Sequence, residues 1–218
     1  MIKTAVRYFR RKFRDLFKER LSKSDRRDMK DKPFVIISNN CWGAEVYQWY
    51  GRSYNSPFIG LYINGPCYHK LLSNFDYYMS QKLVFIEKSK YPQPDWDKRT
   101  YPIANLGDIE IHFSHHENKE IAREKWERRT ERMLTVADKD NYYFKICDRR
   151  GNGEFIEAFH KLPYKNKLSY SLKGYKSLKN MNHIKVKEKA KEGNFVVNGK
   201  KLYKVTFLYF DLHQWLKG

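Results

Sequence analysis

The side chains best suited to chemistry come at three points where an apolar stretch of the chain ends. The first group is Asn39, Asn40, Cys41 and Trp42, the second is His115 and His116, and the third is Asp148 and Arg149. In open α/β sheets, ligands bind outside the carboxyl ends of the strands. A thiol, imidazoles, carboxamides, a carboxylate and a guanidinium would then meet at one sheet edge, where we expect the site.

Cys41 is the candidate nucleophile because it lies in a short strand-to-helix connection. Free backbone amides at a helix N-terminus lower the pKa of a thiol and favour the thiolate. His115 would act as the general base, and Asn39 or Asn40 would donate to an oxyanion. The alternative is that Cys41 is a small buried thiol filling the turn, the commoner role of a lone cysteine.

Further polar side chains would complete this site. Asp148 would be its third catalytic residue, and the alternative is that Asp148 pairs with Arg149. His112 lies in the middle of a predicted strand, which favours a structural role. The residues expected to contact the substrate are Asn39, Asn40, Trp42 and Arg149.

Several common catalytic and cofactor motifs are absent from the sequence. It contains no GxGxxG, GxxxxGK[ST] or GxSxG pattern, so phosphate-binding loops and the usual serine-hydrolase elbow have no support. No metal site and no tightly bound cofactor are expected, and the nearest DxD-like pair, Asp95 and Asp97, lies in a proline-rich loop. The widely spaced Cys41, Cys67 and Cys147 suit free thiols in a reducing cytosol.

The elements that must position these residues alternate between strands and helices. Apolar runs predict strands, and segments with helical spacing separate them. We therefore expect an α/β fold, a mostly parallel open sheet flanked by helices. The expected strands are 34–40, 56–63, 82–88, 107–116, 142–150 and 166–172, and the expected helices are 44–51, 69–81, 119–134, 153–162 and 211–216.

The two ends of the chain differ from its middle. Residues 1–31 are expected to form a basic amphipathic helix and a polar linker, and residues 32–218 a single α/β domain. Within that domain, Asn198-Gly199 predicts the turn of a C-terminal β-hairpin.

The net charge of +19 is concentrated in two segments. Residues 1–32 hold thirteen Lys or Arg against five Asp or Glu, and residues 161–192 hold ten Lys against two Glu, so each carries +8. Residues 33–160 are neutral. Two basic patches on a neutral body suit contact with an anionic membrane surface or polymer.

Apolar residues recur at helical spacing along the N-terminal segment. One interpretation is an interfacial helix on anionic lipid, and the other is a helix packed on its own domain or on a second subunit. Under the first, the membrane-contact residues are Phe9, Phe13, Phe17, Arg10 and Arg14. No run approaches the roughly 18 apolar residues that span a bilayer. The expected location is cytoplasmic, either free or peripheral on the inner face of the cell membrane.

The chain resembles an uncharacterised bacterial domain-of-unknown-function family through linked motifs between residues 32 and 172. These motifs are FVIISNNCWG, YNSPFIGLYI, LGDIEIHFSHHENKEIAREKWERR, KICDRRG and LPYKNKL. Members are commonly labelled exopolysaccharide biosynthesis proteins, and some are labelled acyl- or acetyltransferases. The resemblance implies an α/β fold and a link to surface polysaccharides. The family pattern has tyrosine at position 116, so His115 is the stronger candidate.

The resemblance and the basic patches together suggest a transferase that modifies a sugar on a lipid-linked intermediate. O-acetylation from acetyl-CoA is the specific version, in agreement with the similarity of Asn40-Cys41 to a pair in a capsule-synthesis protein thought to handle an acyl-coenzyme A. The lysine-rich 161–192 segment would bind diphosphate or coenzyme A phosphates.

Two other classes stay open. One is a glycosyltransferase-like enzyme. The other is a non-catalytic binder of an anionic glycan or nucleic acid, in which Tyr164, Tyr170 and Tyr175 would offer a stacking surface between lysines. The sequence leaves the oligomeric state undecided.

Overall fold

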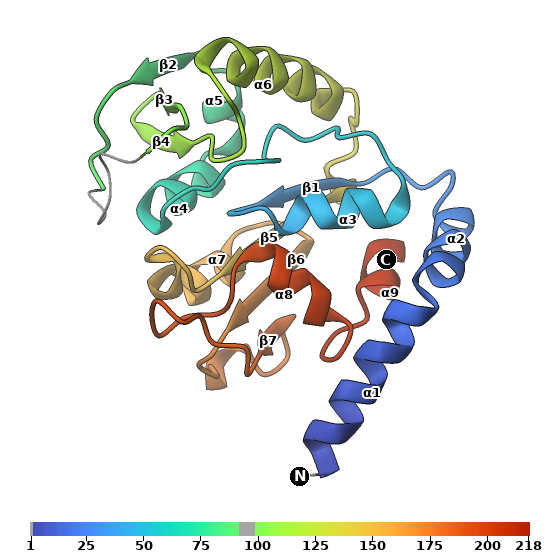
Figure 1. Cartoon of the computed structure of the whole chain (residues 1–218). Helices are drawn as coiled ribbons and strands as arrows, with labels where there is room; N and C mark the ends of the chain where they lie inside the picture. Colours follow the sequence, from blue (N-terminus) through green and yellow to red (C-terminus); the bar gives the residue numbers. More distant parts are fainter. Residues whose placement is uncertain (1, 92–98) are drawn as a thin grey trace.

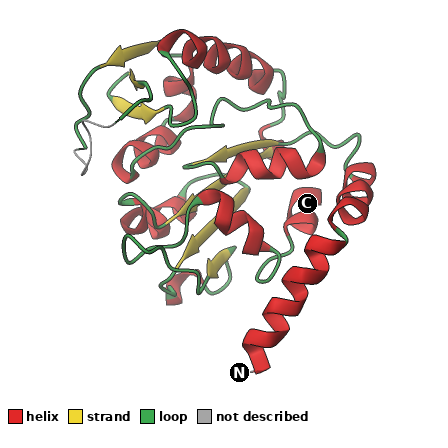
Figure 2. Ribbon diagram, viewed as in Figure 1, coloured by secondary structure: helices red, strands yellow, loops and turns green. Residues whose placement is uncertain are grey.

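The structure contains two β-sheets (Figures 1 and 2). It is a computed structural model that describes residues 2–91 and 99–218. The larger sheet is parallel, in the order β1 (Val35–Ser38), β5 (Tyr142–Cys147), β6 (Asn166–Ser171) and β7 (His183–Lys185). The smaller sheet is antiparallel, in the order β2 (Leu83–Ile86), β3 (Ile103–Leu106) and β4 (Ile109–His112).

Helices surround both sheets (Figure 2). In the N-terminal half they are α1 (Ile2–Leu16), α2 (Lys18–Asp28), α3 (Trp42–Tyr50), α4 (Gly65–Ser73) and α5 (Phe75–Met79). In the C-terminal half they are α6 (Lys119–Leu134), α7 (Ile156–Lys161), α8 (Gly199–Thr206) and α9 (Leu212–Lys217).

Both faces of the parallel sheet are buried. Val35 and Ile37 of β1 pack in one apolar cluster with residues of α4, α5, α6 and α7. Ile36 between them points the other way, into a second cluster with residues of α3, α8 and α9. A strand covered on both sides needs apolar residues at every position, so segments 34–40 and 142–150 could be recognised as continuous apolar runs.

The predicted α/β class, with its parallel sheet and flanking helices, is confirmed. Gly51 ends α3 in the left-handed region, with φ 61°. The side chain of Asn118 caps α6 by accepting from the Ile121 amide, and Asp211 caps α9 by accepting from the Gln214 amide.

The predicted strand at 56–63 is wrong. The segment is largely buried, which explains its apolar character, but among the described residues its β-pairing is a single bridge between Tyr62 and His112. Gly60 lies within it at φ 79°, a left-handed conformation that interrupts extended backbone.

The predicted strand at 107–116 forms only at β4 and belongs to the antiparallel sheet rather than the parallel one. Its partner β3, across a turn with Gly107 at φ 60°, was not predicted. His115 therefore does not lie at the carboxyl edge of the parallel sheet, where the sequence argument placed it.

The predicted polar linker is largely helical. Most of it belongs to α2, which is attached to α3 through two hydrogen bonds to Trp49. The Trp49 indole donates to Asp25 at 2.7 Å, and the Arg26 guanidinium donates to the Trp49 carbonyl at 2.8 Å. Polar residues here pair with a neighbouring helix, so a polar composition alone was a poor guide to a loop.

The predicted hairpin turn at Asn198-Gly199 is also wrong. The Asn198 side chain accepts from the Lys201 amide, which makes it the N-cap of α8. Asparagine favours both hairpin turns and helix N-caps, and the buried Leu202, Tyr203 and Val205 decide for a helix. The antiparallel bridge that exists nearby joins Lys189 to Val196, just before this point.

Candidate functional site

A cavity of about 660 Å³ lies where α3 and α8 begin, between them and α6. The loops at 59–62, 114–116 and 149–150 complete its wall. Of the residues singled out from the sequence, those that line it are Asn40, Cys41, His115, His116 and Arg149. Those outside the described lining are Asn39, Trp42 and Asp148. The Asp95 and Asp97 pair lies outside the described residues.

Cys41 and His115 share this cavity, but by a different route from the one expected. The bridge between Tyr62 and His112 joins the 56–63 segment to β4, and the His115 amide donates to the Gly60 carbonyl at 3.0 Å. These contacts bring the loop after β4 to the start of α3. The catalytic roles of Cys41 and His115 stay predictions.

Asp148 is not among the described residues that line the cavity, and its contacts are structural. Its carboxylate accepts hydrogen bonds from the backbone amides of Val196 at 2.8 Å and Leu172 at 2.9 Å. Burial raises the pKa of this carboxyl. The alternative expectation, a pair between Asp148 and Arg149, is not met, and Arg149 instead pairs with Glu192 at 2.8 Å.

Trp42 and Asn39 are core residues, which corrects their expected role as substrate contacts. The Trp42 ring packs against Tyr170 and Tyr203, and its indole donates to the Thr206 hydroxyl at 3.2 Å. The buried Asn39 donates to the Cys147 carbonyl at 3.2 Å.

The thiol of Cys41 is half-buried at the N-cap position of α3. Its sulfur lies 4.0 Å from the Leu61 carbonyl oxygen. Burial raises the pKa of the thiol, against the smaller lowering effect of the Ser114 hydroxyl. The expected low pKa is therefore contradicted, because withdrawal from water outweighs the favourable helix end.

Lys145 in the middle of β5 is a buried cation that the sequence argument missed. Its ammonium donates to the side-chain oxygens of Asn39 and Asn40, each at 3.2 Å. Burial lowers the pKa of Lys145. The same Asn40 oxygen accepts the Trp42 amide, so Lys145 helps to fix Asn40 at the start of α3. The signal was a lysine inside the apolar run YYFKIC.

The described lining is strongly cationic. Among these residues, the cations are Lys125, Arg129, Arg149, Arg150 and Lys200, and the carboxylate is Glu45.

Arg129 is the most deeply placed of these cations, with 9% of its surface exposed. Its guanidinium donates to the Ile59 carbonyl at 3.0 Å and lies 5.1 Å from the centre of the Tyr54 ring. Within residues 2–91 and 99–218, no carboxylate lies within ion-pair distance of it. Arg129 follows Trp126 at helical spacing and shares its buried stripe, although the segment around it is highly charged.

Arg150 is held by an unusual backbone conformation. Its φ of 55° is left-handed, and its guanidinium lies 3.6 Å from the centre of the Tyr62 ring. Such a conformation costs about 1 kcal/mol or more in a residue with a side chain, and it marks sites where position matters.

The first turns of α3 and α8 meet at the cavity. A Cβ atom on Gly199 would lie 2.5 Å from the Trp42 nitrogen and 2.6 Å from the Asn40 side-chain oxygen, so only glycine allows this approach. Helix N-termini carry partial positive charge and free amides. Two of them beside five cationic side chains make the cavity suited to an anion.

His116 lies deeper in the wall than His115, which is exposed. Its buried Nδ1 has no hydrogen-bond partner among the described residues. Burial lowers the pKa of His116 to about 4, so its imidazole is neutral at pH 7.

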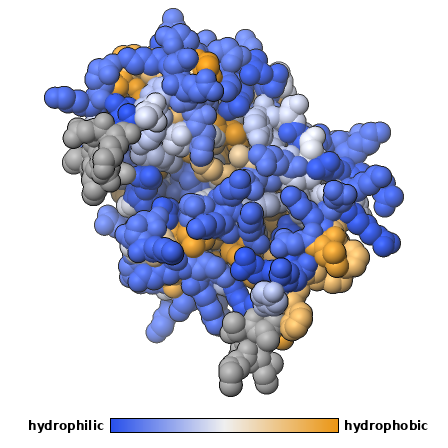
Figure 3. Space-filling model, viewed as in Figure 1, coloured by the Kyte–Doolittle hydropathy of each residue, from blue (hydrophilic) through white to orange (hydrophobic). Residues whose placement is uncertain are grey.

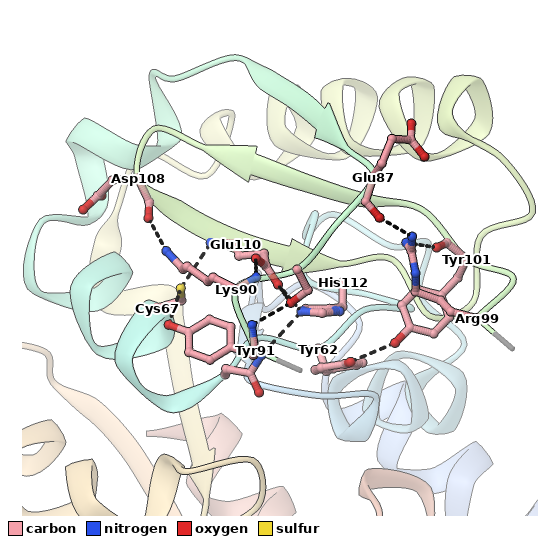
Figure 4. A network of polar contacts seen from close by, with 12 residues as sticks. Tyr62, Cys67, Glu87, Lys90, Tyr91, Arg99, Tyr101, Asp108, Glu110 and His112 are labelled. Carbon is pink, nitrogen blue, oxygen red and sulfur yellow. Dashed lines mark hydrogen bonds and ion pairs between the residues drawn. The ribbon is translucent and has the colours of Figure 1, made fainter. Parts of the chain in front are cut away.

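A buried polar network supports the wall on the Tyr62 side (Figure 4). The Tyr62 ring stacks on His112 with 4.4 Å between ring centres, and its hydroxyl lies 2.8 Å from that of Tyr101. His112 in turn lies 2.7 Å from the Glu110 carboxylate, which accepts the Lys90 amide at 2.9 Å. Tyr62 and Tyr101 both line the cavity, so this network fixes one of its walls. The location of His112 agrees with the structural role expected for it.

The chain is thus an α/β protein with a cavity lined mainly by cationic side chains at the N-termini of two helices. The chain belongs to the family described as Domain of unknown function (DUF1919), which matches residues 12–217. It is similar to an "Uncharacterized protein" of Haemophilus influenzae (strain ATCC 51907 / DSM 11121 / KW20 / Rd), with 33% identity over 201 residues that cover 89% of each chain. The expected membership of an uncharacterised family is confirmed.

Proposed function

We propose that the protein is a transferase of surface-polysaccharide synthesis that binds an anionic sugar intermediate in the cationic cavity. The observation that carries the proposal is the buried guanidinium of Arg129, without a carboxylate partner among the described residues, in a cavity where two helices begin. The link to polysaccharides rests on the motif resemblance.

The charges favour a phosphate-bearing ligand. Burying a guanidinium without an anion is costly, and a phosphate or diphosphate would supply charge-assisted hydrogen bonds. Arg129 and Arg150 come from different elements, so a ligand between them would be held from two sides. The rings of Tyr54, Tyr62 and Tyr101 offer apolar surface to a sugar or a base.

The cavity also suggests how an acetyl group would be transferred from acetyl-CoA. A sugar hydroxyl oxygen attacks the thioester carbonyl, His115 accepts the hydroxyl proton, the C–S bond breaks, and coenzyme A leaves as a thiol after protonation. Helix-start amides would stabilise the oxyanion. Because burial raises the pKa of Cys41, direct transfer suits the site better than an acyl-cysteine intermediate.

The lysine-rich 161–192 segment, expected to bind diphosphate or coenzyme A phosphates, has no part in this proposal. None of its lysines is among the described lining residues, so the phosphate contacts come from α6, α8 and the 149–150 turn. A stacking surface in that segment has less support, because Tyr170 is buried and Tyr164 packs on Phe144 with 3.8 Å between ring centres. These observations rank a nucleic-acid binder below an enzyme. A glycosyltransferase-like reaction would use the same cations to stabilise a departing diphosphate.

Thermal shift with pyrophosphate, acetyl-CoA, nucleotide-sugars and a single-stranded oligonucleotide tests the site. We expect pyrophosphate-bearing ligands to stabilise the wild type, and a Lys125→Gln/Lys200→Gln variant to lose most of the shift. Lys179→Gln, in the lysine-rich segment, is the matched control and should keep it. Equal shifts in both variants, or none with any phosphate-bearing ligand, would contradict the proposal.

A separate assay tests the reaction. Release of coenzyme A from acetyl-CoA in the presence of a sugar acceptor is followed by chromatography. His115→Ala should abolish release, whereas Cys41→Ser should retain it if transfer is direct. Loss in Cys41→Ser together with a mass increase on wild-type Cys41 would point to a covalent intermediate instead.

A further inference from the structure

Helix α1 contacts the rest of the protein through arginine side chains. Arg7 pairs with Glu188 and donates to the Tyr209 hydroxyl. About two helical turns further along the same face, the Arg14 guanidinium lies 4.4 Å from the ring centres of both Trp49 and Phe207. The cationic side of α1 therefore points toward the body at these two positions, which corrects the expectation that Arg14 faces lipid.

The apolar side of α1 is left uncovered. Phe9, Phe13 and Leu16 rank among the most exposed large apolar residues of the protein. In Figure 3 the apolar surface gathers along α1, in the lower right of the view. Phe17, the next member of the stripe, is half-buried against Phe13. A run of exposed phenylalanines on one helix marks an interaction surface rather than scattered surface residues.

A groove of about 1040 Å³ continues this surface between α1 and the 203–213 segment. Its walls include Phe13 and Leu16 on one side and Phe207 and Phe210 on the other. The stripe and the groove thus form one apolar surface, which we call the α1 surface.

Cations border the α1 surface. Arg10, Arg11 and Lys12 are exposed, and within the described part of the chain no carboxylate lies within ion-pair distance of them. Asp15 is the acidic residue of α1, and Asp25 and Asp211 are the carboxylates among the described residues that line the groove. Two copies of the chain that met through this surface would bring like charges together, whereas an anionic lipid surface would complement them.

We propose that the α1 surface binds the anionic face of a membrane, with its phenylalanines in the acyl boundary and Arg10, Arg11 and Lys12 at the headgroups. Within the described residues, no helix has both the length and the apolar character to cross a bilayer. Binding is therefore interfacial. The contacts of Arg7 and Arg14 hold α1 against the body, so the membrane meets a helix with a fixed orientation instead of a free tether. This inference does not depend on the chemistry of the cavity.

Co-sedimentation of the full chain with vesicles tests the proposal. We expect binding to phosphatidylglycerol–phosphatidylcholine vesicles that weakens as salt rises, and almost none to phosphatidylcholine alone. Phe13→Glu should reduce binding by roughly tenfold or more, and Arg10→Gln by roughly fivefold. Leu134→Glu on α6 is the matched control, because Leu134 is 58% exposed and Phe13 is 60% exposed. It should bind like the wild type.

Two further measurements distinguish membrane binding from packing within the protein and from dimerisation. The melting temperature of Phe13→Glu should equal that of the wild type, because Phe13 is exposed. A large drop together with no vesicle binding by the wild type would mean that the stripe packs within the protein, and it would overturn the proposal. A wild-type dimer in light scattering that Phe13→Glu converts to a monomer, again without vesicle binding, would assign the surface to a second copy and overturn it too.

Discussion

The ammonium group of Lys145 lies 3.2 Å from the side-chain oxygen of Asn40, so a buried cation supports a residue that lines the cavity. The same oxygen of Asn40 accepts a hydrogen bond from the Trp42 amide, the first of α3. The Asn40 carboxamide thus links the buried Lys145 to the wall of the cavity.

Lys145→Met should change how stability depends on pH. Burial lowers the pKa of Lys145 from its ordinary 10.5, so the unfolded chain binds this proton more tightly than the folded protein does. The free energy of unfolding of the wild type should therefore rise with pH between the lowered value and 10.5. The variant should lose this rise. Urea unfolding from about pH 7 to about pH 10 measures it, and parallel curves for the two proteins would contradict the prediction.

His116→Gln should make the protein less sensitive to acid. The pKa of His116 is lowered from 6.5 to about 4 by burial, so the unfolded chain takes up a proton first as pH falls. Wild type should then lose about 2 kcal/mol of stability from this residue between about pH 7 and about pH 5. The variant should be spared that part of the loss. His115→Gln is the control, because His115 is exposed, and an equal effect in both variants would refute the assignment.

Cys41 should alkylate before Cys67 and Cys147, but only at alkaline pH. Cys41 is half-buried beside the cavity, whereas the other two thiols are buried. Burial raises the pKa of Cys41 from the ordinary 9.0, so its thiolate is scarce at neutral pH. Iodoacetamide labelling followed by peptide mass spectrometry should show a rate that still climbs above about pH 9. Rapid labelling at mildly acidic pH would instead mean a stabilised thiolate and would revive covalent catalysis.

Asp148→Asn should destabilise the protein by about 1–3 kcal/mol, because one of the two buried amides at Val196 and Leu172 would face an amino group. Denaturant unfolding measures the change. Amide hydrogen exchange should speed up at Val196 and Leu172 more than at residues of β1. Coenzyme A release, scaled to folded protein, should stay near the wild-type value. Its complete loss in a variant of unchanged stability would return Asp148 to the catalytic set.

Strands β1 and β5 of the parallel sheet could be predicted because burial on both faces forces continuous apolar runs, as in 34–40 and 142–150. The edge strand β7 was missed, because it is short and only partly buried. Burial without pairing misled the same argument at 56–63, where Gly60 turns the backbone out of the extended region. Apolar character reports removal from water, and it does not report hydrogen bonding between strands.

The sequence predicted that Cys41 and His115 would lie in one cavity, but the structural reason that it gave for this was wrong. The expected cause was a shared sheet edge, whereas β4 belongs to a separate antiparallel sheet. Arg129 could have been found from its helical spacing after Trp126, and Lys145 from its place inside β5. Their partners, the Ile59 carbonyl and Asn40, are remote in sequence, and no local pattern identifies them.

Helices α3 and α8 run from the cavity to the α1 surface. Their first residues meet at Gly199, while Trp49 and Tyr50 at the end of α3 and Thr206 at the end of α8 line the groove. Helices this short behave as stiff rods, so one end cannot shift without the other. A Cβ atom at position 199 would push the starts of α3 and α8 apart, so this one glycine maintains the packing of two helices that reach the cavity at one end and the groove at the other.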